Sequence, residues 1–148
     1  SERVATWLVK TEPGEFSFDD LARKGVARWD GVSNAQALIH LRAMRDGDAV
    51  LVYHTGDEKA IVGLARVKGE PYEDPARPGK NDRGEAKFAV VDLKAVGAAR
   101  EPVGLARIKG DSRFAAFALV KQGRLSVMPV PTDLAAVLRS WAGLPASK

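Results

Sequence analysis

Residues 29–55, WDGVSNAQALIHLRAMRDGDAVLVYHT, join a polar turn, an amphipathic helix and a strand. Ser33 and Gln36 form an S-x-x-Q pattern, which predicts a capping box at the start of the helix. Apolar residues then recur at helical spacing, and Gly47 offers a left-handed exit from the helix. The chain is apolar on both alternations over 49–52, which predicts a strand covered on both faces.

The polar and aromatic residues of this stretch gather at its two ends. Trp29, Asp30 and Asn34 lie before and at the start of the helix, whereas Tyr53 and His54 end the strand. A helix-to-strand hairpin would bring these two ends within reach of each other. Large rings that converge with amide groups predict a pocket for a flat, polar ligand.

Bulk composition indicates one globular domain spanning 1–148, with 45% hydrophobic and 28% charged residues. The absence of cysteine excludes a disulfide framework, a thiolate nucleophile and a thiolate metal site. A net charge of +4 permits contact with phosphate but does not require it. No apolar run is long enough to cross a bilayer and the first ten residues lack a signal-peptide core, so we expect a cytoplasmic location.

The remaining chain alternates short strands and helices. Strands are expected at 4–10, 60–68, 88–96 and 125–130, and helices after Ser17, at 102–109 and after Thr132. Gly63 marks a bulge or a close backbone approach. Residues 69–87 contain three prolines and three glycines and are expected to form the one long loop. This order predicts an α+β domain with a small, strongly curved sheet or barrel.

Five blocks of the sequence resemble the EVE domain family, and they cover nearly the whole chain in the family's order. The blocks are WLVKTEP at 7–13, WDGVSN at 29–34, LRAMRDGDAVLVYHT at 41–55, VGLARV at 62–67 and QGRLSVMPV at 122–130. The resemblance implies a PUA-like fold, a small pseudo-barrel of mostly antiparallel strands surrounded by helices. In many bacteria such domains stand alone.

The resemblance also implies a function. PUA relatives bind RNA, and EVE domains, like the similar YTH domains, are regarded as readers of modified bases, among them 5-methylcytosine and 5-hydroxymethylcytosine in DNA. One position departs from the family, which commonly has WDGVRN where this chain has Ser33. The departure removes a guanidinium that can donate two parallel hydrogen bonds to a phosphate or a base edge.

A pocket that reads a modified base must extrude it from the duplex, which costs a few kcal/mol, and stacking on aromatic faces offsets about 1–3 kcal/mol of that cost. The candidate pocket residues are Trp7, Lys10, Trp29, Asp30, Ser33, Asn34, Tyr53 and His54. The candidate contacts to phosphate or sugar are Arg77, Lys80, Arg83, Gln122 and Arg124. We expect no metal and no cofactor, because neither histidine shares a recognisable ligand spacing with a carboxylate.

Several candidates also have a structural interpretation. Trp7 lies inside an apolar strand, which favours a place in the core, and Tyr53 can pack its ring under a helix. His54 can serve as a hydrogen-bonding residue, and Asp30 can hold the turn by bonding backbone amides. The basic residues of the long loop can simply be a solvated surface.

Three classes of function therefore compete. The first is a non-catalytic, monomeric reader of a modified cytosine in DNA. The second is an RNA-binding module, which the PUA-like fold equally allows. The third is an enzyme that uses His54 with Asp30 or Asp57 as an acid–base pair, although the sequence contains no nucleophile elbow, zinc-deaminase signature or glycine-rich phosphate loop.

Overall fold

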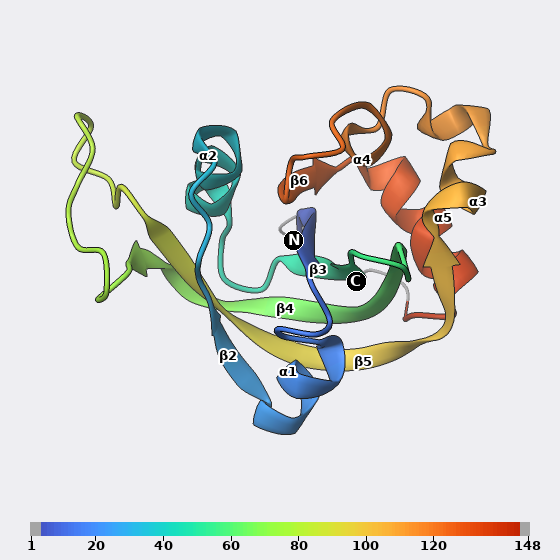
Figure 1. Cartoon of the computed structure of the whole chain (residues 1–148), viewed down its shortest axis with the longest axis horizontal. Coiled ribbons are helices and arrows are strands. Elements are labelled where there is room, and N and C mark those ends of the chain that lie inside the picture. The colour runs from blue at the N-terminus through green and yellow to red at the C-terminus, as the bar shows by residue number, and fades with distance from the viewer. Residues whose placement is uncertain (1–3, 146–148) are drawn as a thin grey trace.

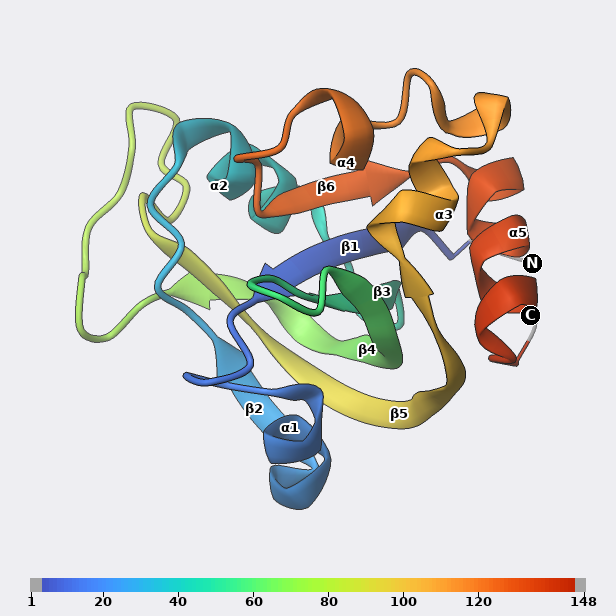
Figure 2. The same cartoon turned by 45° about the vertical axis from the view of Figure 1, so that its right-hand side comes forward.

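The computed structural model describes residues 4–145, whose six strands form one strongly curved sheet (Figures 1 and 2). The strands are β1 (Thr6–Thr11), β2 (Val26–Trp29), β3 (Ala49–His54), β4 (Ala60–Glu73), β5 (Ala89–Gly104) and β6 (Val127–Val130). Their order is β2-β5-β4-β3-β1-β6, and only β1 and β3 run parallel. The expected α+β, PUA-like arrangement with a mostly antiparallel curved sheet is confirmed.

Helices cover the open sides of this sheet. They are α1 (Phe18–Lys24), α2 (Ala35–Ala43), α3 (Leu105–Lys109), α4 (Ala118–Lys121) and α5 (Thr132–Ala142), with a 3-10 turn at Ser112–Phe114. Helix α2 packs against β6 at one edge of the sheet and against β5, the second strand from the other edge. Between residues 4 and 145, no helix has the length and apolar character that a membrane crossing requires.

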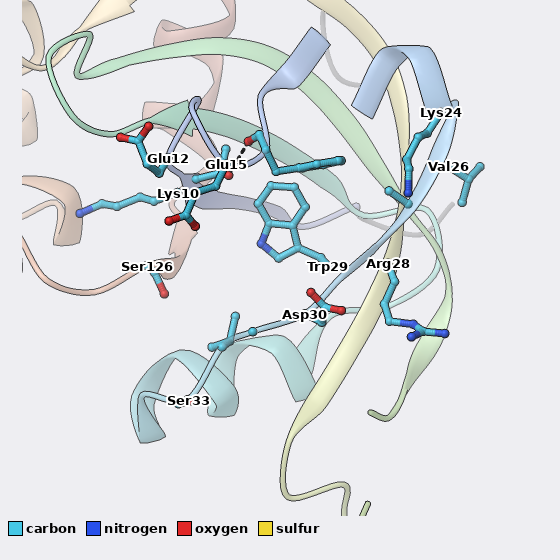
Figure 3. Close-up of a pocket in the computed structure, with 15 residues that line it drawn as sticks. Lys10, Glu12, Glu15, Lys24, Val26, Arg28, Trp29, Asp30, Ser33 and Ser126 are labelled. Atoms are coloured by element: carbon cyan, nitrogen blue, oxygen red, sulfur yellow. Dashed lines mark hydrogen bonds between the residues drawn. The ribbon is translucent and has the colours of Figure 1, made fainter. Parts of the chain in front are cut away.

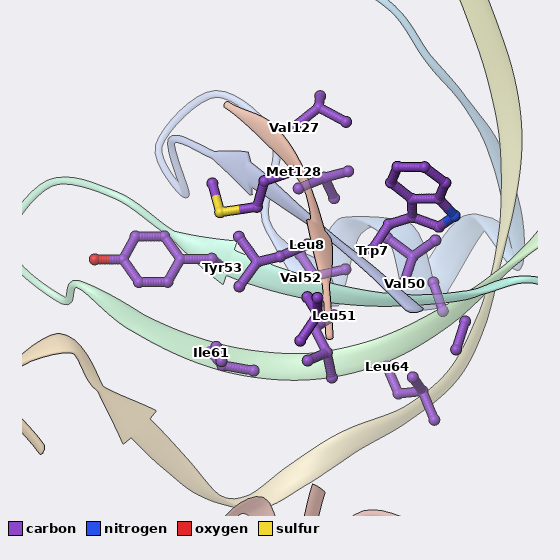
Figure 4. Packing of buried hydrophobic residues seen from close by; sticks show 14 of the residues in the cluster. Trp7, Leu8, Val50, Leu51, Val52, Tyr53, Ile61, Leu64, Val127 and Met128 are labelled. Carbon is purple, nitrogen blue, oxygen red and sulfur yellow. The ribbon is translucent and has the colours of Figure 1, made fainter. Parts of the chain in front are cut away.

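The parallel pair β1 and β3 lies at the centre of the core (Figure 4). Every residue of β3 is buried, which confirms a strand covered on both faces. Asp48, directly before β3, ties the two strands together at one end. Its carboxylate accepts hydrogen bonds from Trp7 Nε1 at 2.9 Å and from the backbone N–H of Arg45 at 2.9 Å.

Two of the predicted helix caps are wrong. Asn34, not Ser33, caps α2, since its side-chain oxygen accepts from the N–H of Ala37 at 3.0 Å. The Ser33 hydroxyl instead accepts from Arg77, a partner 44 residues away that local sequence does not reveal. Thr132 is the first residue of α5 and gives no side-chain cap. The Ser17 cap of α1 is confirmed, with a complete capping box.

The predicted limits of the long hairpin are too short. Strand β4 continues to Glu73 and β5 to Gly104, so the loop expected over 69–87 begins only at 74, and the helix expected over 102–109 begins at Leu105. Strand β2 was not expected at all. These segments are strands because their neighbours supply backbone partners. Strand β2 pairs with β5, the end of β4 pairs with the start of β5, and the end of β5 pairs with the start of β4.

Gly63 lies where the backbone of β4 approaches a helix. The β4–β5 register shifts between Ile61 and Gly63, which confirms the bulge. The close approach is also confirmed, because a Cβ atom at Gly63 would lie 2.5 Å from the Phe18 ring of α1. Only a residue without a side chain lets α1 pack on the sheet at this point.

We predict that Gly63→Ala lowers the free energy of unfolding by about 1–3 kcal/mol, because the added methyl group overlaps the buried Phe18 ring. Urea denaturation measures the change. Gly97→Ala is the matched control on β5, where a Cβ atom meets nothing within 4 Å. Trimming the ring with Phe18→Leu should recover part of the loss in a Gly63→Ala background, and equal costs for the two glycine variants would contradict the prediction.

Candidate nucleic-acid interface

A cleft of about 820 Å³ opens between the end of β1 and the segment that leads from β2 into α2 (Figure 3). Residues 10–16 form one wall, the end of α1 and β2 form the second, and the turn at 30–33 closes the third. The lining residues that carry the argument are Lys10, Phe16, Trp29, Asp30, Ser33 and Ser126. Four of the eight sequence-predicted pocket residues, Lys10, Trp29, Asp30 and Ser33, therefore line one cleft.

Trp29 forms the back of this cleft. Its ring packs edge-on against Phe16, with ring centroids 6.0 Å apart, and the residue is 7% exposed. No described residue accepts a hydrogen bond from its indole Nε1, and this atom is not among the unpartnered polar atoms sealed from solvent. In Figure 3 the indole nitrogen faces the side of the cleft where Ser33 and Ser126 lie. Trp29 thus presents an unused donor to a ligand.

Asp30 presents an unused acceptor beside that donor. Its side chain is exposed, its carboxylate lies next to the Trp29 ring in Figure 3, and it accepts no hydrogen bond from the described part of the chain. The alternative in which Asp30 bonds backbone amides to hold the turn is therefore wrong.

Arg77 holds the turn instead. Its guanidinium donates to Ser33 Oγ at 2.9 Å and to the Val32 carbonyl at 3.1 Å, and it stacks on the Phe88 ring at 4.1 Å. Arg77 also forms a salt bridge with Asp74. A guanidinium from the loop after β4 thus contacts the turn at Ser33. Sequence reasoning placed Arg77 on phosphate, whereas here its donors are used within the protein.

Trp7 and Tyr53 do not share the cleft with Trp29, so the expectation of one cavity lined by all three rings is wrong. Both are buried in the core, at opposite sides of the group drawn in Figure 4. The indole N–H of Trp7 is taken by Asp48. The physical reason is that β1 and β3 are covered on both faces, so side chains at both alternations pack inward. Asn34 does not line the cleft either, because its side chain caps α2.

His54 is also committed to the core, outside the cleft. Its Nε2 accepts from the backbone N–H of Phe18 at 3.0 Å, so Nδ1 carries the proton that is donated to Glu58, 2.7 Å away. Neither Asp30 nor Asp57 is its partner. With both ring nitrogens engaged, His54 joins the end of β3 to the start of α1 and has no free atom for acid–base work.

Lys10 connects the cleft to a second, smaller hollow of about 200 Å³. Its ammonium donates to the Gly123 carbonyl at 2.7 Å and lies 5.8 Å from the Tyr53 ring centroid. Burial lowers the pKa of Lys10 and raises the pKa of Tyr53. Lys59 and Lys109 line the same hollow. Sequence reasoning missed these two lysines, because nothing local links residues 50 positions apart.

The other predicted phosphate contacts divide into two groups. Lys80 is ion-paired with Glu73, and this pairing holds the pKa of the Glu73 carboxyl below its usual value. Arg83, Gln122 and Arg124 have exposed side chains. The last two flank Gly123, which lines the second hollow.

The two hollows differ in charge. The larger cleft is lined by equal numbers of cationic and anionic side chains, namely Lys10, Lys24, Arg28, Glu12, Glu15 and Asp30. The smaller one is lined by the three lysines and no carboxylate. The larger cleft therefore suits a neutral group with both donors and acceptors, and the smaller one suits an anion. Three lining residues of the larger cleft, Glu12, Glu15 and Phe16, were not predicted as site residues, although Glu12 lies within the WLVKTEP block and the other two follow it closely.

We predict that Arg77→Met loosens the 30–33 turn, because it removes both hydrogen bonds to Ser33 and Val32 while keeping an apolar stem over Phe88. Hydrogen–deuterium exchange of the amides at 30–34 should become faster. Arg83→Met, in the same loop but with an exposed side chain, is the control and should leave these amides unchanged. Identical exchange in the two variants would show that Arg77 does not order the turn.

Known proteins resemble this chain over most of its length. Human thymocyte nuclear protein 1 is 32% identical over 123 residues, which is 70% of this chain and 55% of the relative, so the chain spans about half of that protein. A solved structure from Rhodopseudomonas palustris has 40% sequence identity and a TM-score of 0.85, with 97% of each chain covered. The structure of the human THYN1 protein in complex with DNA containing 5-methylcytosine has 26% identity and a TM-score of 0.83, and the match covers 96% of this chain and 99% of that one. The family model described as the EVE domain matches residues 5–140, and this chain belongs to the EVE domain family.

Proposed function

We propose that this chain is a non-catalytic module that reads a modified cytosine, 5-methylcytosine or 5-hydroxymethylcytosine, in DNA. The extruded base enters the cleft beside Trp29. The observation that carries the proposal is a pair of unused groups at consecutive positions in the cleft lining, the Trp29 N–H donor and the Asp30 carboxylate acceptor. The similarity to a human protein solved with DNA containing 5-methylcytosine supports the same ligand class.

The hydrogen-bonding edge of cytosine matches these groups. Its exocyclic amine is a donor, and carboxylates accept from that amine. Its ring nitrogen and carbonyl oxygen are acceptors that an indole N–H can reach. Ser33 and Ser126 add hydroxyl groups, which both donate and accept. A balanced set of charges in the cleft fits a neutral base better than a phosphate group.

The apolar part of the lining accounts for a preference for modified cytosine. Phe16, Val26 and Val32 line the cleft together with Trp29. A methyl group moved from water onto such a surface contributes about 0.8 kcal/mol, which corresponds to roughly a fourfold change in affinity. A hydroxymethyl group needs a polar partner in addition, and the two serines are the candidates.

The lysine-lined hollow is the proposed contact for the flanking phosphates. Lys10 borders both hollows, so a strand whose base occupies the larger one passes directly over the smaller one. Lys59 and Lys109 then supply cationic donors, and Gln122 and Arg124 lie at the same rim beside Gly123. Arg83 remains a candidate on the loop tip.

A binding role is proposed rather than catalysis, because the one histidine beside the site has no free nitrogen. His54 is bonded to Phe18 and Glu58, and it lies outside the lining of the cleft. General acid–base chemistry requires a titrating group within hydrogen-bond reach of the substrate. His54 therefore does not act with Asp30 or Asp57 as the acid–base pair of the enzyme alternative.

We predict a ranked response in a panel of oligonucleotides that carry cytosine, 5-methylcytosine, 5-hydroxymethylcytosine or N6-methyladenine in one sequence. A modified cytosine should bind at least about fourfold more tightly than cytosine, as measured by fluorescence anisotropy at fixed salt. Equal affinity for cytosine and both of its modified forms would end the reader proposal. Tighter binding of RNA of the same sequence would favour the RNA-binding alternative, because the 2′-hydroxyl is the difference.

We also predict that Asp30→Ala weakens binding of the modified oligonucleotide by roughly 5- to 150-fold, the range expected for one base-edge contact worth about 1–3 kcal/mol. The melting temperature should change little, because Asp30 is exposed and accepts no hydrogen bond within the described chain. Asp19→Ala removes an exposed carboxylate on α1 that does not line the cleft, and it controls for net charge. Removing either carboxylate lessens the repulsion of DNA, so Asp19→Ala should bind as tightly as the wild type or slightly more tightly. The same response in the two variants would show that Asp30 makes no base contact.

A further inference from the structure

Arg139 is a buried guanidinium with an unused edge. The residue, on the last turns of α5, is 3% exposed. Its Nη1 donates to the Pro145 carbonyl at 2.5 Å, but Nε and Nη2 are sealed from solvent without any hydrogen-bond partner among the described residues. These two nitrogens form the side-on edge of the guanidinium, the edge that binds a carboxylate through two parallel hydrogen bonds.

The surroundings of Arg139 do not compensate its charge. Within residues 4–145, no carboxylate is ion-paired with it, and the charge that acts on it is the like charge of Arg66. Burial lowers the pKa of the guanidinium, and Arg66 lowers it further. A buried charge without a partner is costly in a folded protein, since neither water nor an opposite charge offsets its desolvation.

A pocket of about 210 Å³ lies beside this group, at the opposite end of β1 from the cleft. Val4 and Thr6 of the N-terminal end contribute to its wall, and one face of α5 supplies much of the rest. Its apolar lining comes from Val4, Ala135, Ala136 and Leu144, and its hydroxyl groups from Thr6, Thr132 and Ser140. The exposed positions of Thr132, Ala136 and Ser140 open it to solvent.

We propose that this pocket binds a small aliphatic carboxylate, whose head group pairs with Arg139 Nε and Nη2 and whose tail lies against the alanine face of α5. The volume is below that of ordinary ligand pockets, which limits the ligand to a few carbons. The single guanidinium matches a single negative charge, and the methyl-lined wall matches an alkyl chain. Inorganic phosphate has no apolar part to fill that wall.

The test is the thermal shift of the whole chain with acetate, butanoate, hexanoate or inorganic phosphate at matched ionic strength. Butanoate or hexanoate at about 100 times its Kd should raise the melting temperature by roughly 5 °C or more. Acetate should act more weakly. A response to phosphate or acetate as large as that to the longer acids would overturn the assignment.

Arg139→Met removes the charge and keeps an apolar side chain of similar length. The response to hexanoate should disappear, and the variant should melt no lower than the unliganded wild type, because a buried uncompensated charge is gone. Arg23→Met, an exposed arginine on α1, is the matched control and should respond like the wild type. A hexanoate response retained in Arg139→Met would overturn the proposal.

Ala136→Leu keeps the guanidinium and fills the pocket from its exposed rim. It therefore tests the site independently if Arg139→Met does not fold. This variant should also lose the hexanoate response, and a retained response would contradict the site. Glu2 lies outside the described residues and carries the same chemical group as the proposed ligand. If the wild type shows no hexanoate response and Glu2→Gln does, Arg139 is paired within the chain and the ligand proposal fails.

Discussion

The parallel pairing of β1 with β3 is the constraint on which the rest of the structure depends. Parallel neighbours cannot be joined by a tight hairpin, so the chain must travel back along the sheet before the second strand begins. Here the return path contains α1, β2 and α2, and its middle pairs with β5 at the far edge of the sheet (Figure 1). The cleft lies between this path and the end of β1. The candidate cleft therefore exists because the parallel strand pair requires this long connection.

The three tryptophans differ in what surrounds their rings. Trp7 gives its N–H to Asp48 and packs in the core. Trp141 lies between Phe114 and the guanidinium of Arg107, which is 4.0 Å from its ring centroid. Trp29 faces the cleft, and no residue of the described chain accepts a hydrogen bond from its N–H. Exposure does not distinguish Trp7 from Trp29, because the two have almost the same exposed fraction, 8% and 7%.

Local sequence signals predicted the parts of the structure that local contacts determine. The Ser17 cap, the fully buried strand that ends in Tyr53 and His54, and the special role of Gly63 are of this kind. The predictions are wrong where a residue distant in the sequence determines the local structure. Ser33 was expected to cap α2 but is held by Arg77, and β2 becomes a strand only because β5 lies beside it.

The candidate site was predictable to the same extent. Trp29, Asp30 and Ser33 are consecutive or nearly so, and the turn that holds them could be recognised from the sequence. Lys10 was found through the block that resembles the family. Whether Trp7, Trp29 and Tyr53 share a cavity depends on how the two faces of β1 and β3 are covered. The periodicity of the sequence does not contain that information. The wall formed by residues 10–16, which includes Glu12, Glu15 and Phe16, also depends on tertiary packing and could not be predicted from the sequence.

The hairpin between β4 and β5 has one further consequence. Beyond Arg77, the loop is closed on itself by the bridge between Lys80 and Ala86, and its tip at 82–84 is exposed. Exposed, self-closed tips tolerate inserted domains, because the added chain leaves and returns at the same place. An effector domain fused at this tip would sit on the same side of the molecule as the 30–33 turn, to which Arg77 anchors the base of the loop. Such a fusion would join a second activity to the domain without altering the lining of the candidate cleft.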